Sequence, residues 1–395
     1  MSAADTTPAA LRDWAARHRD AMLADLAAYV GHESPSDDRP ALARTLDWLR
    51  GWLDTRLGTP DAERLVPGGE HGDVLVRDYA GDGAGPPLLL LCHYDTVWPL
   101  GTLAELPFRV EGDRAWGPGI FDMKAGLVQA VWALRALAAT GLPRPAVRLL
   151  LNGDEEIGSP ASRPVIEAEA AGTGAALVFE AAVDGAVKTA RKGVGLFRVE
   201  AVGVEAHAGL DPDRGVSAVD ELARAVLTLH GLADRGAGTT VNAGVVAGGT
   251  RANVTAGRAH AELDVRVAGE EEMRRIDAAL AALAPHDPRA SLTVSGGWNR
   301  PPMERGAGTA ALYERARRLA DAMGFTLRER AVGGASDGNY VAHLGLPVLD
   351  GLGAVGDGAH ARHEHITLSG MTERAALAAA LITALADGVP EGDEP

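Results

Sequence analysis

The sequence predicts an α/β protein with a mostly parallel sheet, helices on both faces of that sheet, and an inserted, smaller α+β domain. Three observations predict this class. Short, continuous apolar runs alternate with helical patterns near both ends of the chain, as in strands that helices cover on both sides. Between these parts the order of predicted elements changes to β-α-β-β-α-β. The length of 395 residues also favours more than one domain.

Residues 1–191 contain the first group of elements. Apolar residues at helical spacing predict two helices, and near-continuous apolar runs predict three strands. The helices are expected at 8–30 and 123–140, and the strands at 86–97, 146–153 and 175–181. Cys92 lies in the first of these strands and, by strand alternation, points into the core. It is the only cysteine, which excludes a disulfide framework within the chain.

A different pattern begins near residue 192. The elements expected there are a strand at 194–207, a helix at 216–232, strands at 239–249 and 256–267, a helix at 270–284 and a strand at 290–298. This order is a ferredoxin-like split βαβ unit. After Pro302 the first pattern resumes, with helices at 308–324 and 371–388, a Gly-rich loop at 332–340 and an apolar run at 346–355. We therefore expect a discontinuous first domain, 1–191 and 303–395, and an inserted domain, 192–302.

The charge of the chain limits its partners. A formal net charge of -16 opposes binding to nucleic acid and to anionic membranes, but it does not oppose binding of metal cations. Charged residues are scattered through the amino-terminal helical segment, which therefore lacks the uninterrupted apolar stretch of a signal peptide. No apolar run approaches the roughly 18 residues needed to cross a bilayer. We expect a cytoplasmic protein.

Polar residues follow the predicted strands of the first domain where each apolar run ends. His93 and Asp95 lie two residues apart, so their side chains leave the strand on the same face. The others are Asp122, Glu155, Glu156, Glu180 and His360. Open α/β sheets bind ligands at the carboxyl ends of their strands, and this N/O set is one that zinc accepts. Taken alone, Asp122 also fits a helix cap, and Glu155-Glu156 also fits a solvated charge pair.

Five separated motifs resemble those of the M20 metallopeptidases, which include glutamate carboxypeptidase, aminoacylase and succinyl-diaminopimelate desuccinylase. They are "CHYDTVWPLG", "WGPGIFDMKAG", "NGDEEIGS", "FE" and "GDGAH", in this order. The resemblance extends over nearly the whole chain and is greatest to the glutamate carboxypeptidase (carboxypeptidase G) branch. It implies a zinc-exopeptidase-like catalytic domain with two Zn2+ per subunit, for which Co2+ or Mn2+ are known substitutes at N/O sites.

The resemblance also implies roles for the residues at the strand ends. His93 and Glu180 would bind one metal ion, and Glu156 and His360 would bind the other. Asp122 would bridge the two ions through its two carboxylate oxygens. In that family the position of Glu180 accepts either Asp or Glu, so the longer acid is compatible with metal binding.

Three further assignments follow from the same resemblance. Asp95 would accept the other ring N–H of His93 and so fix its tautomer. Glu155 would be the general base that takes a proton from water and delivers it to the leaving nitrogen. His363 and His365 lie close to His360 in the sequence. We favour His360 because Gly-Ala-His matches the motif and an acid, Glu364, follows four residues later.

Residues of the inserted domain match the family's substrate-binding motifs. By that resemblance the domain forms a homodimer and acts as a lid, and His207 stabilises the oxyanion in the active site of the partner subunit. Asn253, Arg266 and Arg300 would bind the free carboxylate of the substrate, for which a planar guanidinium is well suited. Taken alone, these residues also fit a turn histidine, a turn former and strand charges. Arg191-Lys192 fits either added positive charge or a hinge.

The function that the resemblance implies is hydrolysis of the amide bond of an N-acyl or peptidyl amino acid that has a free carboxylate. The alternatives are an aminoacylase or desuccinylase, a dipeptidase, and a catalytically inactive binding protein of the same fold. The last alternative predicts loss of a ligand or of the base, whereas all of these positions are intact. The partners expected are a small-molecule substrate and a second copy of the chain.

Overall fold

The computed structural model describes residues 3–389, with side chains from residue 8 onward; positions 1–2 and 390–395 of the predicted first domain lie outside this range. The chain forms two compact units. The larger contains the described residues up to Ala190, then Arg305–Ala331 and those from Ser336 onward, and the smaller contains Arg191–Glu304 and Val332–Ala335. Val332–Ala335 joins the smaller unit because the Lys192 backbone N–H donates to the Val332 carbonyl at 3.0 Å.

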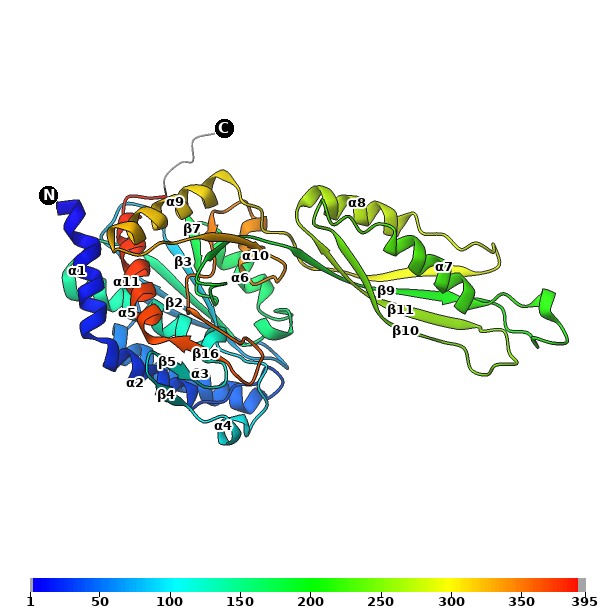
Figure 1. Ribbon diagram of the computed structural model, residues 1–395, viewed down its shortest axis with the longest axis horizontal. Helices are drawn as coiled ribbons and strands as arrows, with labels where there is room; N and C mark the ends of the chain where they lie inside the picture. Colours follow the sequence, from blue (N-terminus) through cyan, green and yellow to red (C-terminus); the bar gives the residue numbers. More distant parts are fainter. Residues whose placement is uncertain (1–2, 390–395) are drawn as a thin grey trace. The chain divides into compact units, whose positions relative to one another are not determined.

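A six-stranded, mostly parallel sheet forms the centre of the larger unit (Figure 1). Its spatial order is β1 (Ala62–Val66), β2 (Val74–Tyr79), β6 (Val147–Asn152), β3 (Leu88–His93), β7 (Ala175–Val178) and β14 (Val348–Leu349). The strands from β6 to β14 are parallel, and β2 and β1 are antiparallel additions at one edge. All six residues of β3 are buried, which explains its uninterrupted apolar sequence.

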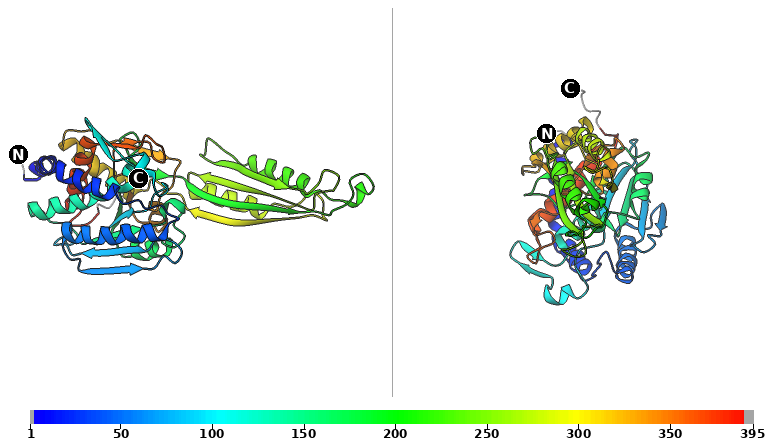
Figure 2. Two further views of the ribbon diagram at one scale, coloured as in Figure 1. Left: turned by 90° about the horizontal axis from the view of Figure 1, so that it is seen from below. Right: turned by 90° about the vertical axis from the view of Figure 1, so that its right-hand side faces the viewer.

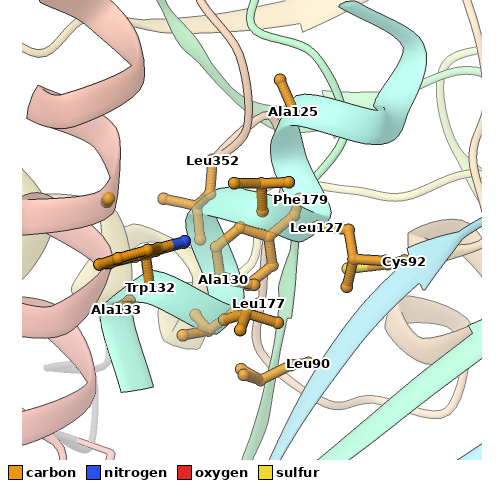
Figure 3. Packing of buried hydrophobic residues seen from close by; sticks show 14 of the residues in the cluster. Leu90, Cys92, Ala125, Leu127, Ala130, Trp132, Ala133, Leu177, Phe179 and Leu352 are labelled. Atoms are coloured by element: carbon orange, nitrogen blue, oxygen red, sulfur yellow. The ribbon is translucent and has the colours of Figure 1, made fainter. Parts of the chain in front are cut away.

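Helices cover both faces of this sheet. On one face lie α1 (Ala3–Arg17), α2 (Arg19–Val30), α3 (Arg39–Leu57), α5 (Ala125–Thr140), α9 (Ala307–Ala322) and α11 (Leu368–Ala384), and on the other α6 (Arg163–Ala170) and α10 (Gly338–His343). Figure 3 shows apolar side chains of α5 beside Leu90 and Cys92 of β3 and Leu177 of β7. The predicted α/β class is therefore confirmed. The single helix predicted at 8–30 is wrong, because the chain breaks at His18 into α1 and α2.

Shorter elements complete the larger unit. They are α4 (Thr102–Glu105), β4 (Arg109–Glu111), β5 (Arg114–Trp116), β8 (Val187–Arg191), β13 (Glu329–Val332), β15 (Gly356–Asp357) and β16 (His365–Thr367). The last residues of β8 and β13, Arg191 and Val332, already belong to the smaller unit. The Gly-rich loop predicted at 332–340 is a loop only in part, because α10 begins at Gly338. No helix among the described residues is long and apolar enough to cross a membrane.

The smaller unit has the predicted β-α-β-β-α-β order. Its elements are β9 (Gly193–Val202), α7 (Ala218–His230), β10 (Thr240–Gly248), β11 (Arg258–Val267), α8 (Glu270–Ala281) and β12 (Ser291–Arg300). The antiparallel sheet has the order β10-β11-β9-β12. Both helices lie on one face of this sheet (Figures 1 and 2). There Val199 and Ala261 of the sheet pack with Leu222 of α7 and Ile276 of α8. Leu196 of β9 points to the opposite face and is exposed.

Candidate metal centre

The carboxyl ends of the central strands bring the polar residues together. His93 ends β3 and is paired with Asn152, the last residue of β6, so the turn that holds Glu155 and Glu156 begins at the same level of the sheet. On the other side of β3, Val178 of β7 pairs with Leu91, which places Glu180 at the level of His93. Parallel strands end at one edge of a sheet, so the imidazole and the carboxylates meet there.

Two clusters of ligand-type atoms form at this edge. In the first, His93 Nε2 lies 3.4 Å from Asp122 Oδ1 and 3.4 Å from Glu180 Oε1. In the second, His360 Nε2 lies 3.4 Å from Asp122 Oδ2 and 3.1 Å from Glu156 Oε2. Asp122 therefore belongs to both clusters, with one carboxylate oxygen facing each imidazole. Neither His363 nor His365 belongs to a cluster of this kind among the described residues.

The donor set fits divalent cations. The Nε2 atom of His93 and the Oε1 atom of Glu156 are buried and have no hydrogen-bond partner among the described residues. The Nδ1 atom of His93 lies 3.0 Å from the backbone carbonyl oxygen of Asp95, which requires a proton on Nδ1. In the neutral ring Nε2 then has no proton, and its lone pair faces two carboxylates. A cation between these groups would stabilise this arrangement. Such histidine and carboxylate sets are typical zinc ligands.

Asp95 connects the two sides of the site. Its Oδ1 atom lies 3.3 Å from His93 Nδ1 and accepts the Glu155 backbone N–H at 3.2 Å. Its Oδ2 atom accepts the Glu156 backbone N–H at 3.1 Å and the Ser36 hydroxyl at 2.7 Å. One buried carboxylate thus fixes both the ring of His93 and the turn that carries Glu155 and Glu156.

Glu364 fixes the backbone around Asp122. Its Oε1 atom accepts the backbone N–H groups of Phe121 at 2.8 Å and Asp122 at 3.1 Å. Its Oε2 atom accepts the Gly119 backbone N–H at 2.8 Å and the Trp98 indole N–H at 2.7 Å. The role of this residue was not predicted from the sequence; the only signal for it is the spacing of four residues after His360. Asp122 does not cap a helix, because α5 begins at Ala125 with Lys124 at its N-cap.

We expect Glu364→Gln to weaken metal binding by about 10- to 100-fold, as is typical when a group that orients a ligand is changed. Each carboxylate oxygen of Glu364 accepts two N–H groups, and in glutamine one of these oxygens becomes an NH2 group, which donates. Two of the four N–H groups therefore lose their acceptor. Competition with a chromogenic chelator measures the affinity. Glu105→Gln, which alters an exposed ion pair with Arg362, is the control and should leave the affinity unchanged. Unchanged affinity in Glu364→Gln would contradict this role.

The side chains of the two clusters shift one another's pKa values. Contact with Asp122 and Glu156 raises the pKa of His360 from 6.5 to about 10. Burial raises the pKa of Glu156 from 4.5 to about 7, and the charge of Asp122 adds to this effect. Burial alone would raise the pKa of Asp122, but contacts with His360 and His93 hold that pKa below its ordinary value. Protons and metal ions therefore compete for the same atoms.

The metal-free protein is expected to lose stability as the pH rises from 6.5 to about 10, the interval between the ordinary and the raised pKa of His360. A group whose pKa is raised by folding stabilises the folded chain below its ordinary pKa, and this contribution disappears as the pH passes the raised value. Thermal melting of the metal-free chain at several pH values tests this. The decline should be smaller in His360→Asn and unchanged in His363→Asn. Equal slopes in wild type and His360→Asn would refute the expectation.

Comparison with known proteins adds to this geometry. A model of "Peptidase family M20/M25/M40" matches residues 89–384. Carboxypeptidase G2 of Pseudomonas sp. (strain RS-16) is 32% identical over 388 residues, which cover 90% of this chain and 92% of that protein. The chain belongs to this peptidase family. It is accordingly a metal-dependent hydrolase with carboxypeptidase relatives, as the sequence motifs predicted.

Solved structures of the M20 family share the fold. Aminopeptidase PepT from Bacillus cereus superposes with a TM-score of 0.78 at 21% identity, over 92% of this chain and 98% of that one. A protein from Bacillus subtilis, described as a dinuclear metal binding peptidase of the M20 family, gives a TM-score of 0.62 at 17% identity, over 93% of this chain and 98% of that one. These similarities show that the fold of this chain is that of the solved structures.

The other predicted site residues of this M20 peptidase lie at two opposite ends of the smaller unit. Arg266 of β11 and Arg300 of β12 both pair with Val194 at the start of β9, next to the chain connections. His207 and Asn253 lie beyond the other end of β9, where the Ala208 backbone N–H donates to the Asn253 carbonyl at 3.0 Å. Eight residues of strand separate the two ends, which is about 27 Å.

Arg266, Arg300 and His207 differ in their hydrogen bonds and in their exposure to solvent. Arg266 binds Asp264 through two N–H groups, at 2.7 and 2.8 Å. Arg300 is buried. The Nδ1 atom of His207 accepts the backbone N–H groups of Gly209 and Leu210, both at 3.1 Å. The neutral ring therefore carries its proton on Nε2, and this N–H of the exposed His207 is directed away from the turn.

Proposed function

We propose that this M20 peptidase binds two zinc ions and hydrolyses the amide bond of an N-acyl or peptidyl amino acid with a free carboxylate. The observation that carries the proposal is the position of Asp122, whose two oxygens each face one histidine within a separate cluster. When bound, a pair of cations would polarise the amide carbonyl and acidify a water molecule. Similarity to carboxypeptidase G2 over most of the chain supports a substrate with a carboxylate.

Each ligand has a defined task in this proposal. His93 and Glu180 would hold one ion, Glu156 and His360 the second, and Asp122 both. The carboxylate of Glu156 is directed at His360. The neighbouring Glu155, whose backbone N–H is held by Asp95, is therefore assigned to proton transfer. Its carboxylate would take a proton from water and pass that proton to the leaving nitrogen.

Substrate recognition would come from the smaller unit. Arg300 and the N–H groups of Arg266 that Asp264 leaves unused would bind the substrate carboxylate. Asn253 lies with His207 at the other end of the sheet, so it would contribute to this site only from a second subunit. The Nε2–H of His207 would donate a hydrogen bond to the oxyanion that forms during amide hydrolysis. Because His207 matches the family's motif, we infer that it serves the active site of a second subunit.

The surface of the smaller unit supports a homodimer through this lid domain. Strand β10 is at the edge of the sheet, where its outer N–H and C=O groups have no neighbouring strand among the described residues. Two valines of this edge, Val245 and Val246, are 49% and 61% exposed, and Leu227 of the adjacent α7 is 74% exposed. An apolar strand edge of this kind is suited to pairing with a second copy.

A cytoplasmic location stays a prediction from the sequence.

A substrate panel tests the proposed activity. We expect the zinc-loaded protein to release amino acids from N-acyl glutamates and from dipeptides that end in glutamate, and a chelator to abolish this activity until zinc is restored. Faster hydrolysis of N-acetyl or N-succinyl amino acids than of dipeptides that end in glutamate would favour the aminoacylase or desuccinylase alternative. Two bound ions without hydrolysis of any member of the panel would contradict the proposal and favour a binding protein.

A further inference from the structure

A polar cavity lies at the end of the main sheet opposite the candidate metal centre. It measures about 510 Å³ and is lined by Arg56, Arg135, Arg144, Trp14, His18 and Tyr79, among others. Tyr79 ends β2 and pairs with Val147, the first residue of β6, whereas His93 pairs with Asn152, the last residue of β6. Five strand residues therefore separate the cavity from the metal centre, or roughly 17 Å along the sheet. This volume is within the usual range for a small-molecule site.

The side chains that line this cavity include three arginines and no carboxylate. Asp25 lies behind them and pairs with Arg56 through two bonds of 2.7 and 2.5 Å. Arg135 and Arg144 form no ion pair with any carboxylate that the structure describes. The Arg144 side chain donates only to backbone carbonyl oxygens, those of Tyr79 and Pro145, both at 3.2 Å. The lining of the cavity is therefore cationic, in a chain whose net charge is -16. The carboxylates of Asp82 and Asp61, which are not part of the lining, offset part of the charge of Arg144.

Arg135 is the least satisfied of the three. Its guanidinium stacks on the ring of Trp132 at 4.5 Å, and Arg56 approaches the same ring at 5.9 Å. Its Nε atom is buried and has no hydrogen-bond partner in the described part of the chain. Burial lowers the pKa of Arg135 and the charge of Arg56 lowers it further, while the charge of Asp25 opposes both effects only in part. Two like charges close together are stabilised when an anion accepts hydrogen bonds from both.

We propose that this arginine cavity is a binding site for a small oxyanion with at least two negative charges, such as a phosphate group or a polycarboxylate. Arg135 and Arg144 would donate charged hydrogen bonds to the anion, and Arg56, already paired with Asp25, would add positive charge. The stacked rings of Trp14 and His18, whose centroids are 3.9 Å apart, form an aromatic wall for the rest of the ligand. The site is separate from the metal centre and independent of the proposed peptidase function.

Calorimetric titration of the zinc-loaded protein tests this proposal. The probes are inorganic phosphate, glycerol 3-phosphate and succinate, and they separate a phosphate ligand from a polycarboxylate ligand. Binding of at least one of these probes is expected. Arg135→Gln and Arg144→Gln should each weaken it by about tenfold or more, because each removes charged hydrogen bonds. Arg274→Gln is the matched control, since it changes an exposed arginine on α8 and should leave binding unchanged. Thermal melting without probe shows whether each variant is folded.

A second variant avoids the arginines. Ala138→Glu adds a carboxylate at an exposed position of α5 that lines the cavity, so it should repel the anion without removing a side-chain contact. Loss of binding in Ala138→Glu would support the proposal even where an arginine variant fails to fold. Binding that persists in folded cavity variants, or that disappears when zinc is removed, would place the anion at the metal centre and overturn the proposal. Absence of binding by all three probes would overturn it too.

Discussion

Replacement of Glu155 by glutamine is expected to lower kcat by about 10²- to 10⁴-fold, the usual contribution of a general base. A neutral amide cannot take the proton that the reaction releases. Glu155 belongs to neither ligand cluster, so the proposed pair of metal ions should remain bound. Steady-state kinetics together with elemental analysis of the bound metal measure the two effects separately.

The matched control for this change is Glu167→Gln, which alters a partly exposed glutamate on α6 that pairs with Arg163. It should leave both kcat and metal content unchanged. Undiminished activity of Glu155→Gln would reject its assignment as the base. Loss of metal along with activity would instead make Glu155 a ligand, and the division of roles between Glu155 and Glu156 would then be wrong.

Substitution of His207 by alanine should lower kcat by roughly 10²- to 10³-fold, the usual cost of removing one donor to an oxyanion. The structure supports this role because two backbone N–H groups hold Nδ1 as an acceptor and leave the ring proton on Nε2. If His207 acts on the partner subunit, mixing this variant with Glu155→Gln should restore activity. A mixed dimer would contain one active site with both an intact Glu155 and an intact His207.

With random exchange of subunits, half of the dimers are mixed and each has one complete site, so about a quarter of the wild-type activity should return. Subunits of Glu155→Gln exchanged with one another are the control and should stay inactive. No recovery in the mixed sample, under conditions where subunits are seen to exchange, would mean that His207 acts within its own chain. Full activity of His207→Ala on its own would remove it from the reaction.

Much of the fold could be read from local patterns. Continuous apolar runs predicted β3, β6 and β7 because strands that are covered on both faces need no polar face. Helical spacing of apolar residues predicted α5 and α11. The antiparallel strands β1 and β2 and the break between α1 and α2 were not foreseen. These features depend on what each segment packs against, which the local pattern does not encode.

In the candidate metal centre, too, some features follow from local sequence and others depend on packing. The sequence by itself placed His93, Asp122, Glu156, Glu180 and His360 at the ends of apolar runs, because residue type and position in a strand are local properties. Only the tertiary structure showed that Glu364 accepts four hydrogen bonds around Asp122, and that Arg56, Arg135 and Arg144 line one cavity. These contacts join segments far apart in the chain, and their distances are decided by how the helices and strands pack, not by the spacing of residues along the sequence.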